Sequence, residues 1–188
     1  DDDCDAEVDE GLGETECGVG ICNHVQPNCV DGTWIECDPF QGKSSEPDLP
    51  DINFVDSDCD GIDGNKDVAI FVDGFTGHND NDGSMMSPLK TLQKGIDVAQ
   101  QTGKSAVYVS LGSYSGQIQL KEGVSVYGGY NAAEGWSRNA SNTTTIQGHI
   151  NPVVANQINQ GTTIARFKIN ASSNASYGGS SMGVKITN

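Results

Sequence analysis

The clearest pattern of hydrophobic and polar positions lies between residues 87 and 130. Four apolar residues recur there at intervals of three or four positions: Leu89, Leu92, Ile96 and Ala99. This spacing places them on one face of an α-helix. Ser87 suits the N-cap, Pro88 the first helical position and Gly103 the end of the helix. The pattern predicts a short amphipathic helix over 88–101.

Short strands are predicted on both sides of this helix. Alternation of apolar with polar or small residues is typical of strands. The alternating residues after the helix are Val107 and Val109, Ile118 and Leu120, and Val124 and Val126. The apolar run Ala69–Val72 predicts a first strand, and further strands are expected over 143–146, 162–169 and 184–186. Glycines separate these segments, as tight corners require.

The later strand signals are regularly spaced. Val126, Ile146, Phe167 and Val184 follow one another at 20, 21 and 17 residues. A period in this range predicts one coil of a solenoid for each interval. Trp136 is expected to cover a side loop or the edge of the core, with a sugar-stacking platform as the alternative.

The segment 87–130 resembles the beginning of a right-handed parallel β-helix, as found in large secreted bacterial surface proteins. The matching stretches are Pro88–Thr91, Ile96–Ala99, Gly112–Tyr114 and Val124–Tyr130. The resemblance implies a mainly β fold in which a short N-terminal helix caps a parallel β-helix. It implies little about activity, because this architecture hosts lyases, adhesins and structural fibres alike.

Charge divides the chain near residue 67. Residues 1–67 hold 20 of the 26 acidic residues and only two basic ones, Lys43 and Lys66, whereas residues 68–188 have a small positive balance. We therefore expect an acidic segment over 1–67 and the β-helix over 68–188. The net charge of -16 argues against nucleic acid as a partner and favours divalent cations.

All six cysteines lie in the acidic segment: Cys4, Cys17, Cys22, Cys29, Cys37 and Cys59. This segment has few large apolar residues, so covalent or metal cross-links are expected to stabilise it. An even count beside a fold of secreted type predicts three disulfides, in any of 15 possible pairings. A zinc site is the alternative, but no C-x-x-C pair is present and only His24 is near.

Two acidic motifs carry the pattern D-x-D-C-D and predict calcium ligands. In the second motif, Asp56, Asp58 and Asp60 occupy positions 1, 3 and 5 of a loop, where calcium sites place carboxylates. The full candidate set there is Asp56, Asp58, Asp60, the Ile62 carbonyl, Asp63 and Asp67. The candidates in the first motif are Asp1, Asp3, Asp5, Asp9 and Glu10. A solvated acidic surface is the alternative, although closely spaced like charges favour a counterion.

Residues 1 to about 65 resemble the MopE-type metal-binding repeat of secreted bacterial proteins. The matching stretches, besides the two acidic motifs, are Gly11–Gly13, Cys17–Cys22, Cys29 and Cys37. Such repeats usually carry a further cysteine before the D-C-D motif, and here position 52 is Ile52. This departure suggests that Cys4 pairs with Cys59.

The chain offers little catalytic equipment. Beyond residue 100 the acids are Glu122 and Glu134, the arginines are Arg138 and Arg166, and His149 has no obvious partner. A glycosidase needs two facing carboxylates, and most other reactions need several positioned groups. We therefore do not expect a catalytic site within this chain.

The sequence is most typical of a calcium-stabilised structural or binding protein of the cell surface or extracellular matrix. The chain begins at Asp1 inside an acidic motif, which favours a mature form or a segment of a longer protein. No apolar run reaches the length of a membrane span. The strand at 184–186 has no evident cap, so we expect either later coils of a longer protein or docking of this end on a partner or another copy, and in both cases a larger assembly than an isolated monomer. The alternative is a carbohydrate-active or sugar-binding β-helix with its site on a polar face or outside this chain.

Overall fold

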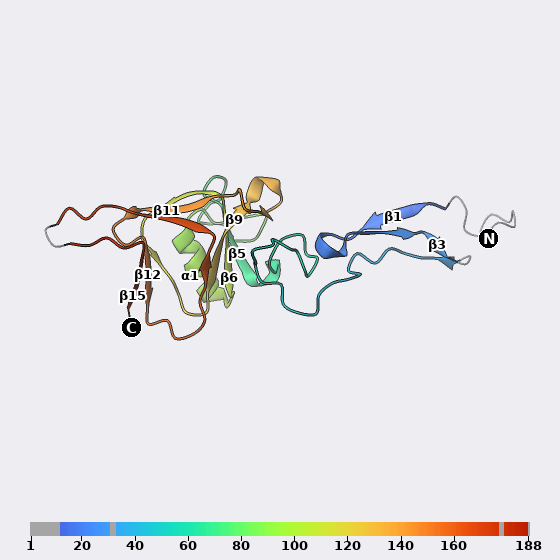
Figure 1. Cartoon of the computed structure of the whole chain (residues 1–188), viewed down its shortest axis with the longest axis horizontal. Coiled ribbons are helices and arrows are strands. Elements are labelled where there is room, and N and C mark those ends of the chain that lie inside the picture. The colour runs from blue at the N-terminus through green and yellow to red at the C-terminus, as the bar shows by residue number, and fades with distance from the viewer. Residues whose placement is uncertain (1–11, 31–32, 177–178, 188) are drawn as a thin grey trace. The chain divides into compact units, whose positions relative to one another are not determined.

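The computed structural model describes residues 12–30, 33–176 and 179–187 (Figure 1). It consists of two compact units, residues 1–65 and 66–188, which are described separately. The boundary lies two residues from the position expected from charge. Within the described ranges, no helix is both long and apolar enough to cross a membrane.

The first unit has little regular structure. Its elements are β1 (Glu14–Cys17), a 3₁₀ helix (Gly20–Cys22), β2 (His24–Pro27), β3 (Cys29–Val30) and β4 (Thr33–Trp34). β1 pairs with β2 and β3 with β4, both antiparallel. The remaining described residues of the unit form turns and bends, many closed by aspartate side chains that accept backbone N–H groups.

The second unit is mainly β, with parallel sheets and one α-helix. Its elements are a 3₁₀ helix (Lys66–Val68), β5 (Ala69–Val72), α1 (Leu92–Thr102), β6 (Ala106–Ser110), β7 (Gly112–Ser115), β8 (Ile118–Gln119), β9 (Ser125–Asn131), a 3₁₀ helix (Ala132–Glu134), β10 (Ser137–Arg138), β11 (Thr144–His149), β12 (Val153–Asn156), β13 (Ile164–Ala165), β14 (Phe167–Ala171) and β15 (Val184–Thr187). The predicted strand Ala69–Val72 is confirmed as β5.

The strands of this unit form three parallel stacks. β5, β6, β9 and β13 follow one another in the first stack, β7, β11 and β14 in the second, and β8, β12 and β15 in the third. After β5, the chain runs through three triplets of strands: β6, β7 and β8, then β9, β11 and β12, then β13, β14 and β15. Each triplet adds one strand to every stack. Among the strands that the structure describes in this unit, only the short β10 runs antiparallel, against the end of β9.

The core lies between the three stacks and α1. Fully buried residues from all of them contribute, including Val72, Ile96, Val126, Ile146 and Val153. Burial of each such side chain contributes roughly 1.5–3 kcal/mol to stability. α1 presents the predicted face, since Leu92, Ile96 and Ala99 are all buried.

The first stack is buried on both faces. Its second face carries an aromatic cluster in which Phe71 lies edge-on to Tyr108 and Trp136, at 5.6 and 4.7 Å between ring centroids. Tyr130 stacks on Tyr108 at 4.8 Å. Trp136 is 3% exposed and donates to the Met85 carbonyl at 3.1 Å, so it covers the core edge and offers no platform for a sugar.

The predicted start of the helix at Pro88 is wrong: α1 begins at Leu92 and its N-cap is Thr91. Leu89 instead forms a parallel bridge with Val72, and its backbone hydrogen-bonds to β5. The pairing holds Leu89 in an extended conformation, which overrides the helical spacing. The end at Gly103 is confirmed, with φ of 70° in the left-handed region.

The predicted period of 17–21 residues is also wrong. Residues that occupy equivalent places in successive strands are unevenly spaced: Val107, Val126 and Ile164 are 19 and 38 residues apart, and Ile118, Val153 and Val184 are 35 and 31 residues apart. Val126 and Ile146, which the prediction treated as equivalent, belong to different stacks. The segment expected as one strand over 162–169 is β13 and β14, separated by Arg166 with φ of 64°.

Gly95 provides a test of how closely α1 packs on the sheet. A Cβ atom at this position would lie 2.4 Å from Val72 Cγ2 and 3.2 Å from Val107 Cγ1. Gly95→Ala gains about 1 kcal/mol of helix propensity, but overpacking a core costs about 1–3 kcal/mol. Both valines are stiff and fully buried, so we expect a net loss of stability in thermal unfolding. Lys94→Ala, at an exposed position of α1, is the control, and a higher Tm for Gly95→Ala would contradict the packing.

Candidate metal site

The candidate site is a cluster of three carboxylates in the first unit. Asp48, Asp56 and Asp58 each offer one oxygen atom, and these oxygens lie within 4.8 Å of one another. Asp48 and Asp58 are only 4% and 6% exposed. Three carboxylates at this separation repel one another strongly where water is excluded, so the arrangement requires compensation by positive charge or by hydrogen-bond donors.

Backbone amides compensate two of the three carboxylates. The Asp60 and Gly61 amides donate to the Asp56 carboxylate at 3.1 and 2.9 Å. The Asp48 carboxylate accepts the Ser57 and Gly64 amides at 3.1 and 3.2 Å. These bonds wrap the loop 56–64 around the cluster and hold its oxygens in place.

Asp58 is compensated less completely: a backbone hydrogen bond from Asp60 favours its charged form, but one of its oxygens stays unsatisfied. Its Oδ1 atom is buried and has no hydrogen-bond partner. Burial raises the pKa of the Asp58 carboxyl, and the neighbouring Asp60 and Asp48 carboxylates raise it further, whereas Lys43 and a hydrogen bond from the Asp60 backbone act in the opposite direction. A buried polar oxygen without a partner is costly, and a bound cation would remove that cost.

The Cys22–Cys59 disulfide holds the loop in this conformation. Cys59, between Asp58 and Asp60, is bonded to Cys22. Next to Cys22, the Ile21 amide donates to the Asp56 carbonyl at 3.0 Å. Gly20 lies so close that a Cβ atom there would be 2.6 Å from the Asp56 carboxylate carbon. The stretch 20–22 is therefore part of the wall of the site.

A second group with metal-ligand chemistry is formed by Cys17, His24 and Cys37. Cys17 and Cys37 are bonded to each other, so neither sulfur is available as a thiolate. His24 Nδ1 lies 2.7 Å from the Cys22 carbonyl oxygen. This geometry supports disulfides over a zinc site in this region.

The structure brings together two of the residues predicted as ligands, Asp56 and Asp58, and adds Asp48. Sequence reasoning missed Asp48 because it lies eight residues before the motif and outside its spacing. The other predicted ligands of this motif, Asp60, Ile62, Asp63 and Asp67, are not among the three residues of the cluster. Asp60 accepts the Ile62 amide at 3.2 Å and Asp63 the Asp51 amide at 3.1 Å. Asp67 lies in the second unit, where its carbonyl accepts a hydrogen bond from Lys104.

The first acidic motif lies outside the described residues. This applies to Asp1, Asp3, Cys4, Asp5, Asp9 and Glu10. The suggested pairing of Cys4 with Cys59 is wrong, because Cys59 is bonded to Cys22. The Cys22–Cys59 bond joins the C-G-V-G-x-C stretch to the second acidic motif. Cys22 is therefore the partner of Cys59, which the sequence alone did not identify.

No protein-family model matches the chain, and neither a curated protein nor a solved structure does so. The conclusions about function therefore rest on the geometry of the chain itself.

The disulfide framework can be mapped directly. We expect proteolysis of the unreduced protein to yield peptides joined through Cys17–Cys37 and Cys22–Cys59. If all six cysteines are oxidised, as their even number suggests, the third bond joins Cys4 to Cys29. Mass spectrometry before and after reduction identifies the linked peptides. Recovery of Cys59 linked to any cysteine other than Cys22 would contradict the structure of the site.

Proposed function

We propose that the first unit binds calcium at Asp48, Asp56 and Asp58, and that the ion stabilises it. The observation that carries this proposal is the buried, unpartnered oxygen of Asp58 inside a cluster of three carboxylates. A cation gives that oxygen a partner and cancels the repulsion that raises the pKa of Asp58.

The donor set favours a hard divalent cation such as calcium. All three side chains offer carboxylate oxygens, which hard cations prefer, and thiolates and imidazoles are absent from this cluster. The remaining positions of a six- to eight-coordinate ion would be filled by water, carbonyls or second oxygens of the same carboxylates.

We further propose that the second unit is the N-terminal part of a right-handed parallel β-helix. The addition of one strand to each of three stacks by every successive triplet supports this. The parallel connection from β5 through α1 to β6 supports the handedness, because such crossovers are right-handed in nearly all proteins.

Together these features support a secreted structural or binding protein of the cell surface or extracellular matrix. Disulfides persist in oxidising compartments, and the described residues contain two of them. The β-helix would be a rigid scaffold for display or assembly, and the acidic unit a calcium-stabilised appendage. The acidic composition supports cations as partners over nucleic acid.

Asp58→Asn separates the cost of the buried charge from the gain of the ion. In wild-type protein, calcium at about 100 times its dissociation constant should stabilise the site by about 2.7 kcal/mol. Asp58→Asn should lower calcium affinity about tenfold or more, because the charge of the ligands sets affinity. In chelator, the same variant should unfold at an equal or higher temperature than wild type, since it removes a buried charge. Calorimetric unfolding with and without calcium measures both effects.

The control is Glu46→Gln, which makes the same change of charge at an exposed residue outside the cluster. It should retain the calcium-induced shift in Tm. An unchanged Tm of wild-type protein on addition of calcium, or an equal shift in Asp58→Asn, would contradict the site.

The pH dependence of stability gives an independent test in metal-free buffer. The folded state holds a proton on Asp58 to higher pH than the unfolded state, because burial raises its pKa. From about pH 3.9 up to this raised pKa, the folded state therefore carries more protons, and its contribution to stability falls as pH rises. Asp58→Asn should remove this decline from the difference between the two proteins. A wild-type-minus-variant stability that is constant from pH 4 to about pH 7 would show that Asp58 titrates normally.

A further inference from the structure

In each of the three stacks of the second unit, the first strand pairs with another strand on one side only. These first strands are β5, β7 and β8, and the other side of each is an outer edge of the stack. Unpaired edges invite other chains, and proteins usually cover them. The β5 edge is covered by the segment 83–89, because Phe71 and Asp73 donate to the Gly83 and Leu89 carbonyls at 2.8 and 2.9 Å.

The β8 edge is covered by one side chain. The Gln119 amide donates to Gln93 Oε1 at 2.7 Å, and Gln93 Nε2 donates to the Gln119 carbonyl at 3.3 Å. The primary amide of Gln93 thus supplies the donor and acceptor that a neighbouring strand would provide.

The β7 edge has no such cover within the described ranges. On its inner side, β7 pairs with β11, and the flanking Gly112 and Gly116 amides donate to carbonyls of the 143–147 segment at 3.0 Å each. Backbone groups of alternate residues point to opposite sides of a strand. The backbone N–H and C=O groups of Ser113 and Ser115 therefore face away from β11.

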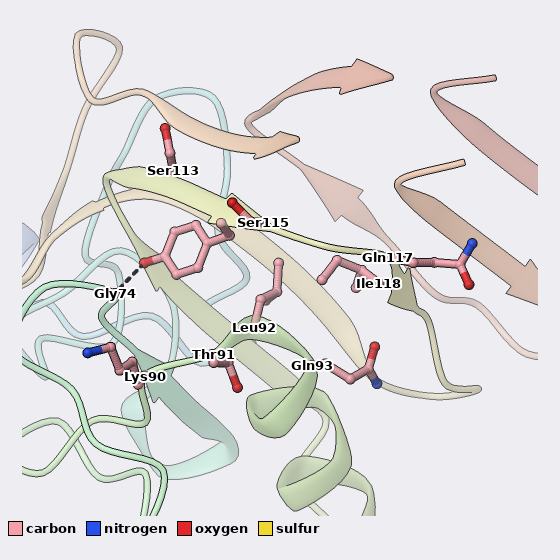
Figure 2. A pocket seen from close by; sticks show the side chains of 10 residues that line it. Gly74, Lys90, Thr91, Leu92, Gln93, Ser113, Ser115, Gln117 and Ile118 are labelled. Carbon is pink, nitrogen blue, oxygen red and sulfur yellow. Dashed lines mark hydrogen bonds between the residues drawn. The ribbon is translucent and has the colours of Figure 1, made fainter. Parts of the chain in front are cut away.

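A cavity of about 270 Å³ lies beside this edge (Figure 2). One wall is Ser113–Ser115 with Gln117 and Ile118, and the other is Gly74 with Lys90–Gln93. The Tyr114 hydroxyl accepts the Gly74 amide at 3.1 Å and donates to the Ser110 carbonyl at 3.0 Å, which fixes the position of β7. Among the described residues that line the cavity there is no carboxylate, and Lys90 is the one charged residue.

We propose that the β7 edge and this cavity bind an extended, acidic peptide segment of another protein as an added strand. β7 has four residues, so the segment that pairs with it is about four or five residues long. The backbone of the bound segment forms hydrogen bonds with the backbone of Ser113 and Ser115, and the negative charge of the segment complements Lys90. This interaction is independent of the calcium site.

The geometry favours a peptide over a polysaccharide. Donors and acceptors at Ser113 and Ser115 repeat at the two-residue spacing of a strand backbone. A sugar ring is commonly held against an exposed aromatic face, whereas the only aromatic residue in the lining, Tyr114, is 5% exposed. A residue of the bound strand in register with Tyr114 would face the apolar part of the cavity near Leu92 and Ile118. The preferred segment therefore has a central apolar residue flanked by acids.

The test uses a synthetic peptide of this pattern, acetyl-Glu-Thr-Val-Thr-Glu-amide, titrated into the full chain and followed by NMR. We expect saturable binding with a dissociation constant of about 1 mM or tighter. N-methylation removes backbone donors of the peptide. Methylation of the amides that face β7 should abolish binding, whereas methylation of the intervening amides, which face away from β7, should not. Absence of binding at several millimolar peptide would overturn the proposal.

Two variants test the contact residues. Ser113→Pro removes an outward N–H and should weaken binding about tenfold, whereas Ser113→Ala keeps the backbone donor and should bind normally. Lys90→Glu, at an exposed residue, should weaken the acidic peptide about threefold and strengthen its lysine analogue. Near-ultraviolet circular dichroism verifies folding, and Lys90→Glu remains informative if Ser113→Pro does not fold. Equal binding by wild type and Lys90→Glu, or tighter binding of oligogalacturonate than of the peptide, would overturn the proposal.

Discussion

Repulsion among three carboxylates is the constraint around which the first unit is built. Asp48, Asp56 and Asp58 are held close together, two of them buried, in a segment with too few apolar residues to form a sizeable core. Backbone amides satisfy Asp48 and Asp56, and the Cys22–Cys59 bond fixes the loop that carries Asp58. The arrangement leaves one oxygen of Asp58 without a partner. Calcium at this point would convert the most costly feature of the unit into a cross-link.

The second unit depends on a different interaction, the pairing of parallel strands in three stacks. Each strand is short and gains stability from the strands before and after it, as in solenoids generally. Such a scheme makes the outer strands vulnerable, and the chain covers two of its three initial edges by different means. The β7 edge lies beside a cavity lined by Lys90 and is not covered in this way within the described residues. For that reason we propose this edge as a binding site.

Local sequence patterns predicted the elements well where the buried residues lie close together in the sequence, as at Ala69–Val72 and on the apolar face of α1. They failed where pairing decides the outcome. Leu89 fits the helical spacing but bridges to Val72, and β7 was missed because Tyr114 is its only large apolar residue. The coil period could not be derived, since loops of different lengths separate strands that pair.

The site shows the same division. The 1-3-5 spacing identified Asp56 and Asp58, because neighbouring ligands leave a local signal. Asp48 gives no such local signal, because it lies outside the motif and is held in the cluster by hydrogen bonds from the Ser57 and Gly64 amides. The partner of Cys59 was likewise not fixed by sequence, which allows 15 pairings.

The most direct test of the calcium site is a crystal structure of the chain grown with calcium and soaked with terbium, whose anomalous signal locates the ion. If the site binds calcium, a peak is expected about 2.4 Å from carboxylate oxygens of Asp48, Asp56 and Asp58. A well-ordered loop 56–64 without a peak, or with the ion bound only to other acids, would contradict the calcium site.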